Sequence, residues 1–217
     1  MRTRIKICGI TNIADAHAAA EAGADAIGMI LGYPASPRCI SVDRATEIAR
    51  ALPPFVTAVG LFVDPPASDV RRALDEARVD MLQFHGSDEI ETPEFCGQFR
   101  APYMKAIRMA PGVDLVQFVF RYRDARALLL DAHVAGIAGG TGQRFDWRRI
   151  PPELSLPVVL SGGLHPGNVS QAIREVRPLA VDVASGVERD DAKGFKDHAR
   201  IRAFVRAVRE TDAELST

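Results

Sequence analysis

The sequence contains few cysteines and no long apolar run, and these absences exclude several classes of protein. Only Cys8, Cys39 and Cys96 occur among the 217 residues, and their spacing fits neither a disulfide framework nor a zinc site. No apolar run approaches the ~20 residues that a membrane span requires, and the first residues do not resemble a secretory signal. We therefore expect a cytoplasmic protein that has no membrane partner.

The chain also lacks an excess of charge of either sign. Its 27 Lys and Arg residues and 28 Asp and Glu residues give a formal net charge of −1, and they are mixed along the chain. No basic stripe or acidic tail indicates a nucleic-acid partner. Because 47% of the residues are hydrophobic, the chain can bury a full core as one domain. We expect this domain over residues 1–210 and a frayed tail over residues 211–217. Nothing in the sequence marks a subunit interface, so we expect either a monomer or a homodimer.

Short apolar runs alternate with amphipathic stretches, which is typical of βαβ units and a parallel sheet. The runs are rich in Ile, Val, Leu and Ala, as expected for strands that are covered on both faces. We predict strands at residues 4–8, 26–31, 57–63, 81–84, 103–107, 127–131, 157–160 and 180–183.

Helical patterns lie between the predicted strands. We predict helices at residues 14–22, 43–52, 67–78, 166–175 and 196–209, and a short or broken helix within residues 88–99, where Pro93 and Gly97 occur. Eight strands in this length predict an α/β fold of the (β/α)8 TIM-barrel type, whose sizes begin near ~200 residues. An open doubly wound sheet is the alternative, but its phosphate-binding turn would come early in the chain.

Three glycine-rich turns follow the late strands and are suited to binding an anion. Glycine lets backbone N–H groups converge on a phosphate without a Cβ in the way. In (β/α)8 enzymes a phosphate commonly binds to the loops after strands seven and eight. The turns predict a phosphate site that contains Gly140, Thr141, Gly142, Gly162, Gly163, Ser185 and Gly186.

Cys8 ends the first predicted strand and precedes Gly9 and a helix. Residues at the carboxyl end of a barrel strand face the reaction site. A helix N-terminus or a nearby cation lowers the pKa of a thiol from about 8.5 toward neutrality, so we expect Cys8 to act as a base or nucleophile, with an inert buried cysteine as the alternative. Lys6 lies two residues earlier and therefore on the same side of the strand, where it could neighbour the thiol or pair within the barrel.

Asp131 follows the apolar run Leu128-Leu129-Leu130. A carboxyl group at this strand end can serve as a general acid. The alternative is that Asp131 only caps a helix or stabilises a turn. Asp182 lies inside the last predicted strand and is the rival carboxylate, which we expect to hold a loop.

Arg38 lies in the segment Ser36-Pro37-Arg38, where prolines stiffen the loop. Arginine suits the bidentate recognition of a carboxylate, although a surface arginine is an ordinary alternative. His85 follows the fourth predicted strand and could line the pocket, although we expect rather a histidine that satisfies a turn. No pair of histidines and carboxylates has the spacing of a metal site, so we expect no metal.

Taken together, these segments resemble phosphoribosylanthranilate isomerase of tryptophan biosynthesis. The resemblance extends over residues 6–11, 36–38, 59–63, 82–86, 105–108, 139–147, 161–164 and 181–188, with Asn168-Val169 in addition. The pairing of the cysteine-bearing first segment with Gly-Gly-Thr-Gly and Phe-Asp-Trp is its most specific part. Met29, Leu31 and residues 192–197 depart from the family pattern.

The resemblance implies a (β/α)8 barrel and an Amadori rearrangement of a phosphorylated small-molecule substrate without any cofactor. It implies that Cys8 is the general base, Asp131 the general acid and Arg38 the ligand of the anthranilate carboxylate. A histidine-pathway phosphoribosyl aminoaldose isomerase and a non-catalytic phosphosugar-binding barrel are the alternatives.

Overall fold

Eight parallel strands form a closed barrel in the computed structural model, which describes residues 2–132 and 145–216. β1 pairs with both β2 and β9, and this pairing closes the ring. The open-sheet alternative is therefore wrong, and the predicted strands are confirmed to within one residue at each end. The barrel strands are β1 (Arg4–Ile7), β2 (Ala26–Leu31), β4 (Thr57–Phe62), β5 (Met81–Phe84), β6 (Tyr103–Arg108), β7 (Ala127–Asp131), β8 (Val158–Leu160) and β9 (Ala180–Val183).

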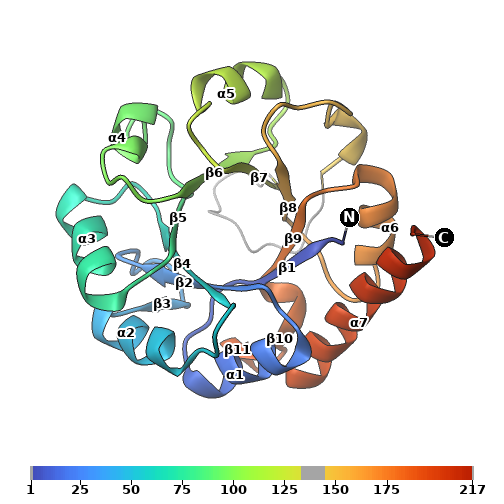
Figure 1. Ribbon diagram of the computed structural model, residues 1–217, viewed down its shortest axis with the longest axis horizontal. Helices are drawn as coiled ribbons and strands as arrows, with labels where there is room; N and C mark the ends of the chain where they lie inside the picture. The colour runs from blue at the N-terminus through green and yellow to red at the C-terminus, as the bar shows by residue number, and fades with distance from the viewer. Residues whose placement is uncertain (1, 133–144, 217) are drawn as a thin grey trace.

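Helices surround the barrel (Figure 1). They are α1 (Ile13–Ala22), α2 (Val42–Ala51), α3 (Ala67–Arg72) with its π-helical continuation η1 (Ala73–Ala77), α4 (Pro93–Gly97), α5 (Leu115–Arg121), α6 (Val169–Val176) and α7 (His198–Glu214). The expected short helix is α4, which begins at Pro93 because the Thr92 hydroxyl accepts a hydrogen bond from the Phe95 N–H. We did not predict α5, because its residues are rich in Val and Phe, which are common in strands. The Asp114 carboxylate caps the start of this helix.

The two faces of the barrel strands carry different cores. The larger core lies between the strands and the helices. A smaller core fills the barrel interior and comprises Val59, Met104, Ala106, Ala127, Leu129, Val159 and Ala180. Because side chains alternate along a strand, the inward positions nearer the carboxyl ends hold Gln83, Asp131, Ser161 and Asp182. The interior therefore changes from apolar to polar toward the carboxyl-terminal mouth.

A small hairpin follows the last barrel strand. The 3-10 helix η3 (Ser185–Val187) leads into β10 (Glu188–Arg189), which pairs antiparallel with β11 (Ala192–Lys196). The sequence-based expectation of a helix from residue 196 is wrong at its start, because Lys196 belongs to β11 and Asp197 caps α7. The two-residue strand β3 (Cys39–Ile40) and the 3-10 helix η2 (Trp147–Arg149) were likewise not expected.

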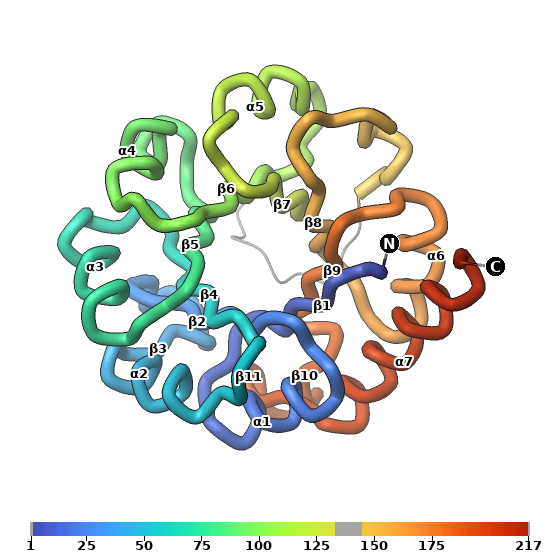
Figure 2. Tube along the Cα trace, in the orientation of Figure 1, coloured from blue at the N-terminus to red at the C-terminus, as the bar shows by residue number. Residues whose placement is uncertain are grey.

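The C-terminal helix is tied to the first strand. Figure 2 shows the chain passing once around the barrel, which brings the first and last elements together. The backbone N–H and hydroxyl of Thr3 donate to the Asp212 carboxylate at 2.8 and 2.7 Å, and Thr211 is buried. α7 therefore continues through Glu214, beyond residue 210, where we had expected a frayed tail. Among the described residues, no helix has both the length and the hydropathy needed to span a membrane.

Candidate active site

A cavity opens at the carboxyl-terminal end of the barrel and gathers most of the residues singled out in the sequence. Cys8, Arg38, His85, Asp131, Gly162, Gly163, Asp182 and Ser185 all line it. Residues far apart in the chain meet here because every barrel strand ends at this rim. Gly140, Thr141 and Gly142 lie outside the described residues.

Cys8 lies directly after β1 and is 4% exposed. Its backbone N–H donates to the Val183 carbonyl at 2.8 Å, which anchors the residue on the last strand. Burial raises the pKa of the Cys8 thiol above its ordinary value, and the charge of Lys6 offsets this only in part. The expected lowering toward neutrality is therefore wrong, because desolvation of the thiolate outweighs its cationic neighbour.

Lys6 fulfils both of the roles considered for it. Its Nζ donates to Asp182 Oδ1 at 2.7 Å, and it also interacts with Cys8. Burial acts to lower the pKa of Lys6, but Asp182 and Cys8 outweigh it and hold the pKa above the ordinary value. Asp182 also accepts a hydrogen bond from Ser161 Oγ at 3.1 Å, so it links the last strand to the turn after β8.

Gly28 on β2 gives Cys8 and Lys6 their space. A Cβ at this position would lie 2.7 Å from Cys8 Sγ and 2.9 Å from Lys6 Nζ. A glycine inside a strand can mark such a close approach, and the run Ala-Ile-Gly-Met-Ile-Leu therefore carried a signal that we did not use.

Gly28→Ala is expected to displace Cys8 and Lys6, and in an enzyme whose reaction uses this thiol the displacement would lower kcat by about tenfold or more. Both displaced atoms end side chains that can move, so the melting temperature should change by only a few degrees. Steady-state kinetics and thermal unfolding of the same preparation check this. An unchanged kcat would show that the crowding does not affect the groups that react.

Asp131 is the last residue of β7 and is 5% exposed. Its Oδ1 accepts the backbone N–H of Ala132 at 2.9 Å, and its Oδ2 lies 3.1 Å from His85 Nε2. The carboxyl group is therefore held in one orientation at the cavity wall.

Gln83 and His85 point inward from the same side of β5, and the sequence-based reasoning missed Gln83. Gln83 Nε2 lies 3.1 Å from His85 Nδ1. An amide nitrogen only donates, so in this arrangement Nδ1 accepts and Nε2 is left to donate to Asp131. Period-two alternation before His85 was the signal that could have identified Gln83.

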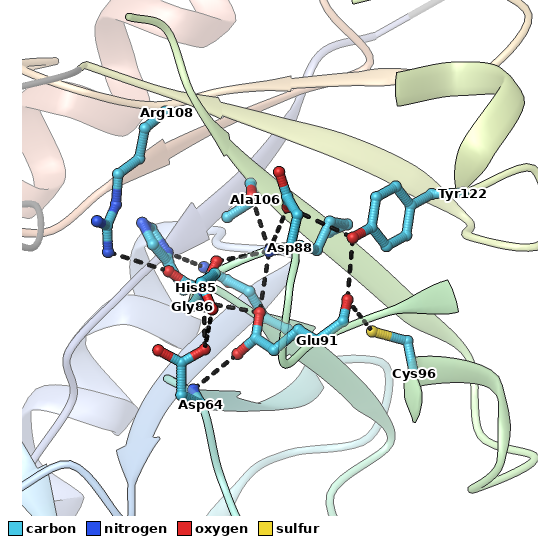
Figure 3. A network of polar contacts seen from close by, with 12 residues as sticks. Asp64, His85, Gly86, Asp88, Glu91, Cys96, Ala106, Arg108 and Tyr122 are labelled. Carbon is cyan, nitrogen blue, oxygen red and sulfur yellow. Dashed lines mark hydrogen bonds and ion pairs between the residues drawn. The ribbon is translucent and has the colours of Figure 1, made fainter. Parts of the chain in front are cut away.

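A buried network holds the loop that carries His85 (Figure 3). Lys105 Nζ donates to the Gly86 carbonyl at 2.8 Å and to Glu91 Oε2 at 2.9 Å. Glu91 in turn accepts the backbone N–H groups of Asp64 and Gly86, at 3.0 and 2.7 Å. Burial raises the pKa of Glu91, and the Lys105 and Glu91 side chains are fully buried. This pair fixes the backbone beside the cavity from the helix side of the barrel.

Arg38 is paired, which the sequence did not reveal. Its Nε donates to Glu188 Oε1 at 2.6 Å and its Nη2 to Glu188 Oε2 at 2.8 Å. Lys196 Nζ donates to Glu188 Oε1 at 3.0 Å. Glu188 and Lys196 escaped notice because the β10–β11 hairpin was not predicted.

The glycine turns after β8 and β9 lie next to each other. Gly162 and Gly163 have φ values of +82° and +68°, which favour glycine. Gly186 packs against the backbone of Leu164, in the turn after β8, so the two turns are in contact. Ser161 already donates to Asp182, whereas Ser185 lines the cavity.

Fold and site together define a (β/α)8-barrel enzyme with its polar groups at the carboxyl-terminal mouth. The family model for N-(5'phosphoribosyl)anthranilate (PRA) isomerase matches residues 5–207. The chain belongs to this family, and the resemblance seen in the sequence is confirmed.

Individual relatives agree over nearly their whole lengths. N-(5'-phosphoribosyl)anthranilate isomerase of Nitrosococcus oceani is 55% identical over 208 residues, which cover 96% of this chain and 98% of that protein. The crystal structure of phosphoribosyl anthranilate isomerase from Thermotoga maritima is 38% identical, with a TM-score of 0.85 and coverage of 96% and 99%. Another, in complex with reduced 1-(o-carboxyphenylamino)-1-deoxyribulose 5-phosphate, is 36% identical, with a TM-score of 0.79 and the same coverage.

Proposed function

We propose that this protein isomerises N-(5-phospho-β-D-ribosyl)anthranilate to 1-(2-carboxyphenylamino)-1-deoxy-D-ribulose 5-phosphate in tryptophan biosynthesis. The observation that carries the proposal is the shared cavity, in which Cys8 and Asp131 stand with Arg38 and the glycine turns. An Amadori rearrangement requires one acid, one base and anchors for the two ends of the substrate. The family membership supports the same activity.

Asp131 acts first, as the general acid. It donates its proton to the furanose ring oxygen, the bond between C1 and that oxygen breaks, and the substrate nitrogen supplies the electron pair that forms a Schiff base. The hydrogen bonds from Ala132 and His85 hold the carboxyl group while this happens. General acid catalysis of this kind contributes about 10²–10⁴-fold.

Cys8 acts second, as the general base. Its thiolate removes the proton from C2, and the electron pair of that C–H bond moves through the Schiff base to the nitrogen and forms an enolamine. The enolamine then tautomerises to the ketone, with a proton added at C1 and one lost from the C2 hydroxyl. Because the substrate nitrogen is the electron sink, the reaction requires neither a metal nor an organic cofactor.

The two ends of the substrate bind at different parts of the mouth. Arg38 would bind the anthranilate carboxylate. The phosphate would bind to the backbone N–H groups of the glycine turns, with Gly140, Thr141, Gly142, Gly162, Gly163, Ser185 and Gly186 as the proposed site. The contact between the turns after β8 and β9 supports this assignment.

A turnover assay without added metal tests the function. Conversion of the anthranilate substrate should abolish its fluorescence, with the same rate in the presence of EDTA. The histidine-pathway aminoaldose serves as the competing substrate. Turnover of that compound alone would favour the sister isomerase, and binding without any turnover would favour a phosphosugar-binding barrel.

Arg38→Ala is expected to raise KM by about tenfold or more, because a charge-assisted bidentate contact to the substrate carboxylate is lost. The change in kcat should be smaller. Kinetics with the anthranilate substrate measure both constants, and an unaltered KM would contradict the role of Arg38.

We also place this enzyme in the cytoplasm as a monomer or homodimer that binds neither nucleic acid nor membranes. The balanced charge supports the absence of a nucleic-acid partner. Sedimentation of the purified chain at several concentrations decides between the two oligomeric states.

A further inference from the structure

We propose that Glu188, supported by Lys196, is a positioning residue that orients Arg38 and makes the cavity selective for a ligand carrying one carboxylate. The inference rests on the proposed function in one respect, which is that Arg38 binds the carboxylate of the substrate. It adds Glu188 as the residue that sets the orientation of the Arg38 guanidinium.

Glu188 occupies one whole edge of the Arg38 guanidinium. Its two carboxylate oxygens accept from Nε and Nη2 at 2.6 and 2.8 Å, so the planar group cannot rotate without breaking both bonds. Nη1 has no hydrogen-bond partner within residues 2–132 and 145–216. The edge formed by Nη1 and the second hydrogen of Nη2 is thus the one left for a ligand, and Arg38 lines the cavity.

The aliphatic part of Arg38 is confined as well. A Cβ on Gly9 would lie 2.5 Å from Arg38 Cδ, so the arginine crosses directly over this glycine. The backbone N–H of Arg38 donates to Ser36 Oγ at 3.2 Å. Because both the aliphatic part and the guanidinium of Arg38 are held in place, the side chain loses little conformational entropy when a carboxylate binds.

The charges favour a single anion. Glu188 carries one negative charge against the positive charges of Arg38 and Lys196, and the side chains of Glu188 and Lys196 are 5% and 0% exposed. Burial acts to raise the pKa of Glu188, but the hydrogen bond from Arg38 and the charge of Lys196 outweigh it and hold the pKa below the ordinary value. Burial lowers the pKa of Lys196, and the charge of Glu188 opposes this. With Lys196 protonated, these three side chains carry one positive charge in excess, which favours one bound carboxylate.

Glu188 acts through Arg38 in this proposal, so the test compares two ligands. One is the reduced product analogue, reduced 1-(o-carboxyphenylamino)-1-deoxyribulose 5-phosphate, and the other is the same compound made from aniline, which lacks the carboxylate. Calorimetry of the Glu188→Ala variant should show a Kd at least about tenfold higher for the first ligand and changed less than about twofold for the second. Kinetics should show this loss in KM rather than in kcat.

A double-mutant cycle separates positioning from general damage. In an Arg38→Ala background, Glu188→Ala should cause no further loss of affinity for the carboxylated ligand. Glu188→Asp, which keeps the charge, should restore part of the selectivity. Glu214→Gln removes an exposed glutamate charge on α7 and is the matched control, with both affinities unchanged.

Equal losses for both ligands would overturn the proposal, because Glu188 would then support the neighbouring η3 turn rather than Arg38. Unchanged affinity for both ligands would overturn it too. If Arg38→Ala itself does not distinguish the two ligands, the proposed carboxylate site is wrong, which is a separate failure. Should Glu188→Ala fail to fold, Lys196→Met is measured in its place, and unchanged selectivity between the two ligands would contradict the proposal.

Discussion

Cys8→Ala is expected to lower kcat by about a hundredfold or more, which corresponds to at least ~2.7 kcal/mol of transition-state stabilisation. The variant keeps Asp131 and the anchors, so ring opening and binding stay possible while the C2 proton has no base. The reduced product analogue should bind with little change in Kd. Steady-state kinetics and calorimetry on one preparation make the comparison, and near-normal turnover would remove Cys8 from the mechanism.

The pH dependence of the unmodified enzyme provides an independent check. Burial raises the pKa of the Cys8 thiol, and only the thiolate can accept the C2 proton. The fraction of thiolate grows as the pH rises toward that elevated pKa, so kcat/KM for an open-chain substrate analogue, which needs no proton from Asp131, should increase from neutral to alkaline pH. A profile for this analogue that is flat or falls over this range would contradict a buried thiol base.

Asp131→Asn is expected to lower kcat by a similar factor, about a hundredfold or more, because an amide cannot supply the proton that opens the ring. The asparagine retains the shape of the side chain and can still accept the Ala132 N–H. The affinity for the product analogue should therefore stay close to that of the unmodified enzyme.

A second substrate separates ring opening from the later step. An open-chain substrate analogue does not need its ring protonated, so Asp131→Asn should convert it faster, relative to the unmodified enzyme, than it converts the closed substrate. Cys8→Ala should be slow on both. Equal defects of Asp131→Asn on the open and closed forms would move Asp131 away from ring opening.

The strands could be read from the sequence because each is a short apolar run that is covered on both faces. Cys8 and Asp131 could be placed for the same reason, since each stands where such a run ends and the ends of parallel strands share one rim. The π-helical η1 and the Phe- and Val-rich α5 depend on packing and capping that a periodicity does not encode.

The partners of the site residues were harder to find. Glu188 lies 150 positions from Arg38 in the sequence, and the pairing depends on a hairpin that is formed by only a few residues. Lys105 was not considered as a site residue, and its buried pairing with Glu91 forms on the side of β6 that faces the helices. The direction of the Cys8 pKa shift was predicted wrongly because the degree of burial is a property of the assembled barrel.

The register between β1 and β9 places Lys6 directly opposite Asp182. The counter-ion of the lysine that adjoins the thiol thus arrives only when the final strand docks. A chain still being synthesised, or cut before residue 180, has Cys8 and Lys6 but not the carboxylate that completes their surroundings. The surroundings of the thiol are therefore complete only when the last barrel strand is in place.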